Sequence, residues 1–196
     1  MNNLIQKSIR ESIAVKQTIL TDAAFLQKIE LTAQVFIAAF RSGGKVLFCG
    51  NGGSAADAQH LAAELSGRFY TDRPPLYAEA LHVNSSFVTA VANDYGYDEV
   101  FARMTEAAGR KGDVLAAFST SGNSPNILKA IEKAKDQGMT VVGFTGATGG
   151  KMAGLCDVLL NVPSADTPRI QESHILIGHI ICDVVEREMF GGGHGL

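Results

Sequence analysis

The sequence has few cysteines, no cluster of basic residues and no long apolar run, and each shortage excludes a class of protein. The first seven residues contain no apolar stretch ending at a small-residue cleavage site, so they predict no signal peptide. The most apolar late segment, 175–185, is interrupted by His179 and Asp183 and is too short to span a bilayer. We therefore expect a cytoplasmic protein with no membrane partner.

The cysteines and the charges narrow the class further. Cys49, Cys156 and Cys182 are odd in number, far apart and without a CxxC pair, so we expect reduced thiols packed like small hydrophobic side chains. Seventeen Lys and Arg residues face twenty Asp and Glu residues, for a net charge of −3, and no segment concentrates the positive charge. This distribution argues against a nucleic-acid partner, because such binding relies on clustered Lys and Arg.

The sequence does have enough apolar residues for one core, with 46% hydrophobic and 19% charged residues over 196 positions. Apolar residues recur at three- and four-residue spacing through 1–42, which predicts helix, and Asp22 is placed to cap a second helix after a break near Thr21. Short apolar runs then alternate with helical segments. The expected strands are 45–49, 77–83, 114–118, 140–145 and 158–162, and the expected helices are 54–66, 125–137 and 168–189.

This alternation predicts an α/β fold with one parallel sheet flanked by helices. We expect an N-terminal helical oligomerisation segment at 1–42, an α/β domain at 43–190 and a disordered glycine-rich tail at 191–196. The N-terminal helices carry more apolar positions than one small sheet easily covers. Partner subunits are therefore expected to bury some of these positions, Phe36 and Phe40 included.

Two loops lie where ligands bind in such sheets, beyond the carboxyl ends of strands. One is Asn51-Gly-Gly-Ser54, and the other is Ser119-Thr-Ser-Gly-Asn-Ser124, which offers hydroxyl and backbone N–H groups at the start of a helix. These donors and the helix dipole favour an anion, most often phosphate. Ordinary turn and capping chemistry also uses Ser, Asn and Gly, but two loops in equivalent positions favour phosphate.

Nucleotide binding is the weaker interpretation of these loops. Gly50 to Ala55 satisfies G-x-G-x-x-A after a strand, but a dinucleotide site also needs an acidic residue at the end of the next strand. That strand ends near His82-Val-Asn84, which contains none. The sequence also lacks G-x-x-x-x-G-K-[ST], which argues against a nucleoside triphosphate.

Candidate metal ligands occur on two of the predicted helices. His60 and Glu64 are four residues apart and share one helix face, while Gln171 and His179 lie on the last helix. These side chains are acceptable zinc ligands, although a single His–Glu pair at this spacing is more often a surface hydrogen bond. Gln171 and His179 are separated by about 12 Å of helix. They can share one ion only if both reach toward it, or if they come from different subunits.

As a set, the motifs closely resemble the phosphoheptose isomerase family of sugar-isomerase (SIS) domain proteins. The matching motifs are Cys49-Gly-Asn-Gly-Gly-Ser54, His60-Leu-Ala-Ala-Glu64, Ala92-Asn-Asp94, Ser119-Thr-Ser-Gly-Asn-Ser124 and Arg169-Ile-Gln171 with His179. The resemblance covers nearly the whole chain. It implies conversion of sedoheptulose 7-phosphate to D-glycero-D-manno-heptose 7-phosphate, the first step of ADP- or GDP-heptose biosynthesis for glycans such as the lipopolysaccharide core. It also implies a homotetramer built partly by the N-terminal helices.

The resemblance also assigns roles to single residues. It implies Glu64 as the base that moves a proton between adjacent carbons through an enediol, and His179 as the acid–base group for the oxygens. It implies one zinc ion per subunit, held by His60, Glu64, Gln171 and His179, and ligation would compete with the role of Glu64 as base. The implied substrate contacts are Asn51, Gly52, Gly53, Glu64, Asn93, Asp94, Ser119, Thr120, Ser121, Ser124 and Gln171.

One alternative belongs to a different functional class. The protein that associates with the replication initiator DnaA shares this fold and length but is a non-catalytic tetrameric scaffold, and its pattern lacks equivalents of Glu64 and His179. Because this sequence keeps both residues, the isomerase is favoured. One departure from the family pattern is Pro168, which stands where some relatives have an acid and puts a family role for that acid in doubt.

Overall fold

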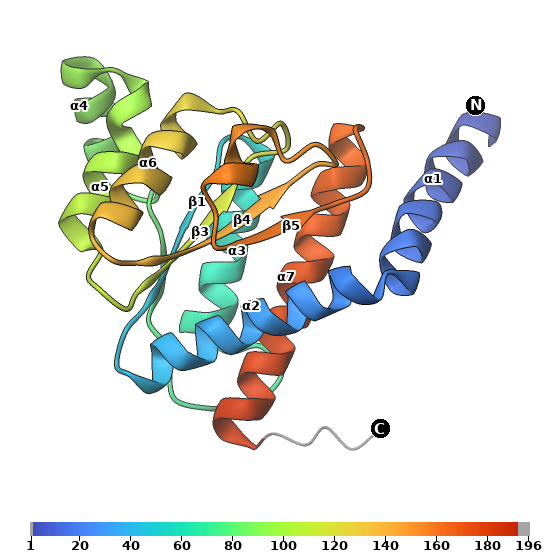
Figure 1. The fold of residues 1–196 in the computed structure, drawn as a ribbon, viewed down its shortest axis with the longest axis horizontal. Coiled ribbons are helices and arrows are strands. Elements are labelled where there is room, and N and C mark those ends of the chain that lie inside the picture. Colours follow the sequence, from blue (N-terminus) through green and yellow to red (C-terminus); the bar gives the residue numbers. More distant parts are fainter. Residues whose placement is uncertain (1, 192–196) are drawn as a thin grey trace.

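A parallel five-stranded sheet forms the centre of the computed structural model, which describes residues 2–191 (Figure 1). Its strands are β1 (Val46–Cys49), β2 (Ala78–Ala80), β3 (Val114–Phe118), β4 (Thr140–Thr145) and β5 (Val158–Asn161). They lie in the order β2–β1–β3–β4–β5, and every neighbouring pair is parallel. Parallel strands need crossover helices, which cover both faces of a sheet and favour almost wholly apolar strands. The predicted α/β fold is confirmed.

The helices divide between two core clusters, one on each face of the sheet. Side chains alternate along a strand, so Val46 and Phe48 of β1 enter one cluster, while Leu47 and Cys49 enter the other. The first cluster also draws on α1 (Asn2–Thr21), α2 (Ala23–Arg41), α3 (Gly53–Ser66) and α7 (Thr167–Phe190). The second draws on α4 (Ser85–Tyr95), α5 (Val100–Ala108), α6 (Pro125–Asp136) and the short η2 (Gly150–Gly154), and η1 (Tyr97–Glu99) joins α4 to α5.

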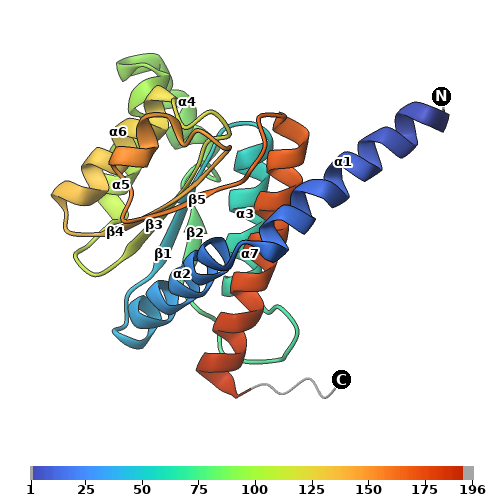
Figure 2. The ribbon, with the colours of Figure 1, turned by 45° about the vertical axis from the view of Figure 1, so that its right-hand side comes forward.

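Asp22 separates the first two helices, as the sequence predicts. Its carboxylate accepts a hydrogen bond from the Phe25 N–H at 3.0 Å and so caps the start of α2. Beyond this break α1 projects from the body of the molecule in both views (Figures 1 and 2). Ile19 is its one buried residue among those described. Arg169 of α7 donates a hydrogen bond to the Ser8 carbonyl, which ties the helix to the body.

By length and composition alone, α2 could cross a membrane. Its apolar face nevertheless packs into the core, where the ring of Phe36 lies edge-on to that of Phe48 at 6.0 Å between centroids. Phe36 and Phe40 are only 2% and 8% exposed. The expectation that a partner subunit buries these two residues is therefore wrong, because the chain's own core already covers them.

The structure adds elements between residues 84 and 113 that were not predicted from the sequence. Asn84 caps α4 by accepting from the Phe87 N–H at 3.1 Å, and η1 and α5 follow. Val91 is the one fully buried residue of α4 among those described, and Phe87, Val88 and Ala92 pack beside it at helical spacing, so the sequence contained an apolar face that the prediction missed. At the other end of the chain Gly191 caps α7 with φ +67°, and the rest of the predicted tail, 192–196, lies outside the described residues.

Candidate functional site

The first candidate loop turns tightly from β1 into α3 because its glycines have no side chains. A Cβ at Gly50 would lie 2.4 Å from the Ser54 carbonyl oxygen, and one at Gly53 would lie 2.5 Å from Gln171 Nε2. Gly52 is the N-cap of α3 and has φ +56°, a left-handed conformation that glycine tolerates. No side chain caps this helix start, and the N–H groups of Ser54 and Ala55 instead donate to the backbone carbonyls of Asn51 and Gly52 at 3.1 and 3.0 Å.

The second loop gathers three serine hydroxyls at the start of α6. Ser119 Oγ lies 2.9 Å from Ser124 Oγ and 3.4 Å from Ser121 Oγ. Ser124 is the N-cap of α6, yet its side chain makes no capping hydrogen bond. A hollow of about 320 Å³ opens beside this loop, lined by Thr120, Ser121, Asn123, Gly146, Ala147, Thr148, Ser164, Ala165, Thr167 and Ile170. The lining includes Thr120 and Ser121 of the loop and Thr167, the first residue of α7, so hydroxyl-bearing residues and a helix start border the hollow, as a phosphate site requires.

The two loops meet because β1 and β3 are neighbours, with Cys49 and Ala117 in register at their carboxyl ends. Asn51 of the first loop and Asn126 of α6 exchange two hydrogen bonds of 2.9 and 2.8 Å. The hydroxyl of Tyr97 in η1 donates to Asn51 Oδ1 at 3.3 Å.

The predicted contacts Asn93 and Asp94 lie exposed at the end of α4, next in the chain to η1. Asn93 Nδ2 donates to Asp94 Oδ1 at 2.8 Å. Most of the predicted substrate contacts thus lie on segments that converge at this edge of the sheet.

His60, Glu64 and His179 form the second part of the site, at the seam between α3 and α7. His60 Nε2 lies 3.1 Å from Glu64 Oε1 and 2.9 Å from His179 Nε2. Gly178 makes this approach possible, since a Cβ there would lie 2.4 Å from Leu61 Cδ1. One ligand atom from each of the three residues lies within 4.8 Å of the others, so the group could hold a metal ion.

Gln171 is the predicted ligand that this group does not include. Its amide lies against Gly53, at the start of the α3–α7 seam. Gly53 precedes His60 by seven residues and Gln171 precedes His179 by eight, which places the amide about 10–12 Å along the helices from the two imidazoles. Within one chain, therefore, Gln171 belongs with the loops rather than with His60, Glu64 and His179.

Burial changes the protonation of groups around this seam. The pKa of His179 lies below its usual value because of burial and then because of nearby His60, and the charge of Glu64 partly offsets both effects. Burial raises the pKa of Asp57, one turn before His60, to about 6, and His60 opposes that rise. His174 is a core residue, because it is fully buried and its Nε2 lies 3.0 Å from the Thr145 carbonyl oxygen.

A buried ion pair next to the seam was not predicted from the sequence. Glu186 of α7 accepts hydrogen bonds from the N–H groups of Phe69, Tyr70 and Thr71 at 2.8–3.1 Å, and from Arg73 Nε at 3.0 Å. Arg73 in turn donates to the carbonyl of Glu64 at 2.8 Å. The signal available in the sequence was an acidic residue inside an apolar helix, which needs a buried partner.

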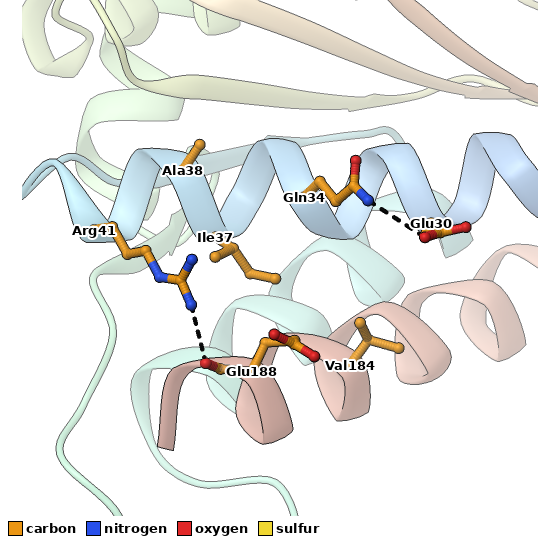
Figure 3. Close-up of a pocket in the computed structure, with 7 residues that line it drawn as sticks. All are labelled: Glu30, Gln34, Ile37, Ala38, Arg41, Val184 and Glu188. Atoms are coloured by element: carbon orange, nitrogen blue, oxygen red, sulfur yellow. Dashed lines mark hydrogen bonds between the residues drawn. The ribbon is translucent and has the colours of Figure 1, made fainter. Parts of the chain in front are cut away.

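A further groove of about 430 Å³ lies between α2 and α7 (Figure 3). It is lined by Glu30, Gln34, Ile37, Ala38, Arg41, Val184 and Glu188, and Arg41 Nη2 donates to the Glu188 carbonyl at 3.1 Å. None of these seven residues is a predicted site residue. The predicted site residues therefore lie at the loops and at the α3–α7 seam, outside this groove.

Comparison with known proteins supports the family resemblance seen in the sequence. The profile of the SIS domain family matches residues 10–146. The chain is 54% identical to the phosphoheptose isomerase of Aneurinibacillus thermoaerophilus over 190 residues, covering 97% of this chain and 96% of that protein. It is 52% identical to the phosphoheptose isomerase of Clostridium acetobutylicum over 191 residues, covering 97% of both.

Solved structures agree with the sequence relatives. The phosphoheptose isomerase of Neisseria gonorrhoeae superposes with a TM-score of 0.88 at 43% identity, covering 94% of this chain and 98% of that one. The phosphoheptose isomerase of Francisella tularensis superposes with a TM-score of 0.90 at 38% identity, covering 94% and 97%. With this fold, both loops and the paired Glu64 and His179 in place, the chain belongs to the phosphoheptose isomerase family of SIS-domain proteins.

Proposed function

We propose that the chain isomerises sedoheptulose 7-phosphate to D-glycero-D-manno-heptose 7-phosphate, the first step of a cytoplasmic pathway to nucleotide-activated heptose for surface glycans such as the lipopolysaccharide core. Family membership over almost the full length supports the substrate. The observation that carries the catalytic assignment is the meeting of Glu64 and His179 beside His60. A non-catalytic scaffold has no need to bring these groups together.

Ketose–aldose isomerisation needs one group to move a proton between adjacent carbons and another to serve the oxygens. Glu64 is the base in this proposal, since a carboxylate can accept and return the carbon-bound proton of the enediol step. His179 serves the oxygens. Because its pKa lies below the usual value, the ring is neutral near pH 7 and can both accept and donate a proton.

The donor set at the seam also fits zinc. Two imidazole nitrogens and a carboxylate oxygen are ligands that zinc prefers, and one ligand atom each from His60, Glu64 and His179 lies within 4.8 Å of the others. A zinc ion there would polarise the sugar carbonyl, and Gln171 would join these ligands only from another subunit.

The same geometry supports an active site shared between subunits of a homotetramer. Glu64 lies eleven residues after Gly53, so about 16 Å of helix separates it from the loops of its own chain. An extended seven-carbon sugar phosphate spans about 10 Å at C–C bond lengths near 1.5 Å. Loops of one chain and acid–base groups of another can act on one substrate if the subunits bring them together. Exposed Ile5, Ile9 and Ile13 on α1 offer an apolar surface for that assembly.

Direct turnover tests the proposal. The purified chain, incubated with sedoheptulose 7-phosphate and without nicotinamide or ATP, should form the aldose, which NMR of the sugar protons distinguishes from the ketose. Absence of turnover with and without added zinc would contradict the activity. If the same protein then bound DnaA tightly, the scaffold alternative would replace it.

A further inference from the structure

Asn51 and Asn126 form a carboxamide pair between the two binding loops. Asn51 Nδ2 donates to Asn126 Oδ1 at 2.9 Å, and Asn126 Nδ2 donates back to Asn51 Oδ1 at 2.8 Å. Asn126 is 2% exposed and lies in the first turn of α6, directly after the serine-rich loop. A buried amide is strongly held by such bonds, because breaking them leaves polar groups without partners.

The pair also connects a third segment of the site. Tyr97 donates its hydroxyl to Asn51 Oδ1 at 3.3 Å, and η1, which contains Tyr97, follows the α4 end that carries Asn93 and Asp94. A carbonyl oxygen has two acceptor positions, and Asn126 and Tyr97 use both of those on Asn51. Asn51 can therefore offer a substrate only its remaining amide N–H and its backbone.

The Asn51–Asn126 pair joins the first loop to the serine-rich loop through side chains. Gly52 and Gly53 have no side chains, and the N–H groups of Ser54 and Ala55 donate to the Asn51 and Gly52 carbonyls at 3.1 and 3.0 Å. These backbone bonds shape the turn itself but do not fix it against the serine-rich loop. Resting on the proposed function, we infer that Asn126 is a positioning residue for substrate binding. It acts through Asn51, fixes the first loop against the serine-rich loop, and contributes no group to the reaction itself.

This role predicts a particular kinetic change. The loops hold parts of the sugar phosphate that do not react, so they bind ground state and transition state alike, and weakening them raises KM more than it lowers kcat. In Asn126→Leu, which keeps the size but removes both bonds, KM for sedoheptulose 7-phosphate should rise about tenfold, with kcat within about threefold of the parent. Tyr97→Phe removes a single bond and should raise KM about two- to threefold.

The experiment compares these variants with Asn51→Leu, Asn51→Leu/Asn126→Leu and the control Thr32→Val. Thr32 is fully buried in α2 and donates to the Lys28 carbonyl at 2.8 Å, so its loss tests the effect of removing a buried hydrogen bond away from the site. Thr32→Val should lower the melting temperature and leave KM unchanged. In the Asn51→Leu background, Asn126→Leu should change KM less than about twofold, since its partner is already gone. Asn126→Ser provides a smaller polar replacement if Asn126→Leu does not fold.

An unchanged KM in folded Asn126 variants would overturn the inference. It would also be overturned if Asn126→Leu raised KM as much in the Asn51→Leu background as it does in the parent. If the parent chain showed no turnover, the proposed function would be contradicted instead. The positioning role of Asn126 would then be tested by the binding of inorganic phosphate. In that case, inorganic phosphate should raise the melting temperature of the parent more than that of Asn126→Ser. Equal rises in parent and variant would refute the role of Asn126.

Discussion

At the scale of single residues, Gly178 sets how closely α3 and α7 approach. A Cβ at this position would lie 2.4 and 2.6 Å from the two methyl carbons of the buried Leu61, so an added methyl group must displace Leu61 or the helix that carries it. The imidazole of the next residue, His179, meets His60 only because the helices are this close. A residue with no side chain therefore controls the distance between two groups of the site.

Gly178→Ala should lower kcat at least tenfold and reduce the free energy of unfolding by about 1–3 kcal/mol, because overpacking forces α3 and α7 apart. Gly154→Ala is the matched control, since a Cβ there meets no described atom within 4 Å. Steady-state kinetics and urea denaturation measure the two effects. Full activity in Gly178→Ala would show that the helices tolerate separation and that the close approach is not needed.

Glu64→Gln removes the proposed base but keeps the size and shape of the side chain. A general base typically contributes a factor of about 10²–10⁴, so kcat should fall within that range while KM stays close to that of the parent. Glu188→Gln changes an exposed glutamate of α7 and should leave both constants unchanged. Bound zinc is measured in parallel, so that loss of metal is distinguished from loss of the base. Near-parental kcat in Glu64→Gln would remove Glu64 from the chemical step.

At the scale of elements, the loop after α3 is held by a single carboxylate. Glu186 accepts three backbone hydrogen bonds from residues 69–71, and Arg73 links it to the end of α3. These donors stabilise the charged form and outweigh the effect of burial, so they lower the pKa of Glu186 from 4.5 to about 2. Phe69 at the start of this loop packs on His179, with 5.6 Å between ring centroids, so the loop held by Glu186 also borders the proposed acid–base residue.

The lowered pKa of Glu186 predicts how stability depends on pH. A carboxylate whose folded pKa is below its unfolded pKa stabilises the fold above the unfolded value, and that contribution is lost as pH falls from about 5 toward 2. The free energy of unfolding of the parent should therefore decrease as pH falls through this window. The free energy of unfolding of Glu186→Gln should be lower at pH 7 and should decrease less. Arg73→Met leaves the buried carboxylate without its ion-pair partner and should cost about 3 kcal/mol at pH 7. Denaturation curves from pH 2 to 7 check both predictions. If the stability of the parent and of Glu186→Gln changed equally with pH, the lowered pKa of Glu186 would be contradicted.

Some elements could be predicted from the sequence because their own residues specify them. The buried strand β3 is a continuous apolar run, and β4 is mostly apolar and rich in β-branched residues, so the bounds of both could be predicted residue for residue. The Asp22 cap is equally local. In contrast, α4 was not predicted, although Phe87, Val88, Val91 and Ala92 recur at helical spacing and Asn84 caps its first turn. Only Val91 among the described residues of α4 is fully buried.

The candidate site also has parts that local sequence predicts and parts that it does not. The i, i+4 spacing places His60 beside Glu64 on one helix, but their meeting with His179 depends on packing between helices far apart in the sequence. The Asn51–Asn126 and Arg73–Glu186 contacts span 75 and 113 positions and leave no local pattern. The family resemblance supplied the roles of the loop residues, which spacing alone could not.

At the scale of the whole molecule, α1 presents an apolar row that the described chain does not cover. Ile5, Ile9 and Ile13 are 55–60% exposed, and Leu20 is 64% exposed. On α7, Leu176 and Ile180 are also exposed, at 37% and 41%. Surface of this kind is costly in water and is typical of contacts between subunits. The proposed shared site needs such contacts, because one chain separates its loops from Glu64 by about 16 Å of helix.

Ile9→Asp/Ile13→Asp tests this assembly without disturbing the core, since both residues are exposed, unlike Phe36 and Phe40. Two buried charges at a subunit contact would be strongly unfavourable, so the variant should form smaller species with little activity, while far-UV circular dichroism stays like that of the parent. Ala14→Asp places a charge on an exposed position of α1 away from the row and should keep both mass and activity. Light scattering gives the mass, and turnover is measured at the same concentrations. Because a shared site needs groups from two chains, a folded monomer with full activity would contradict the shared site even if the isomerase activity itself were confirmed.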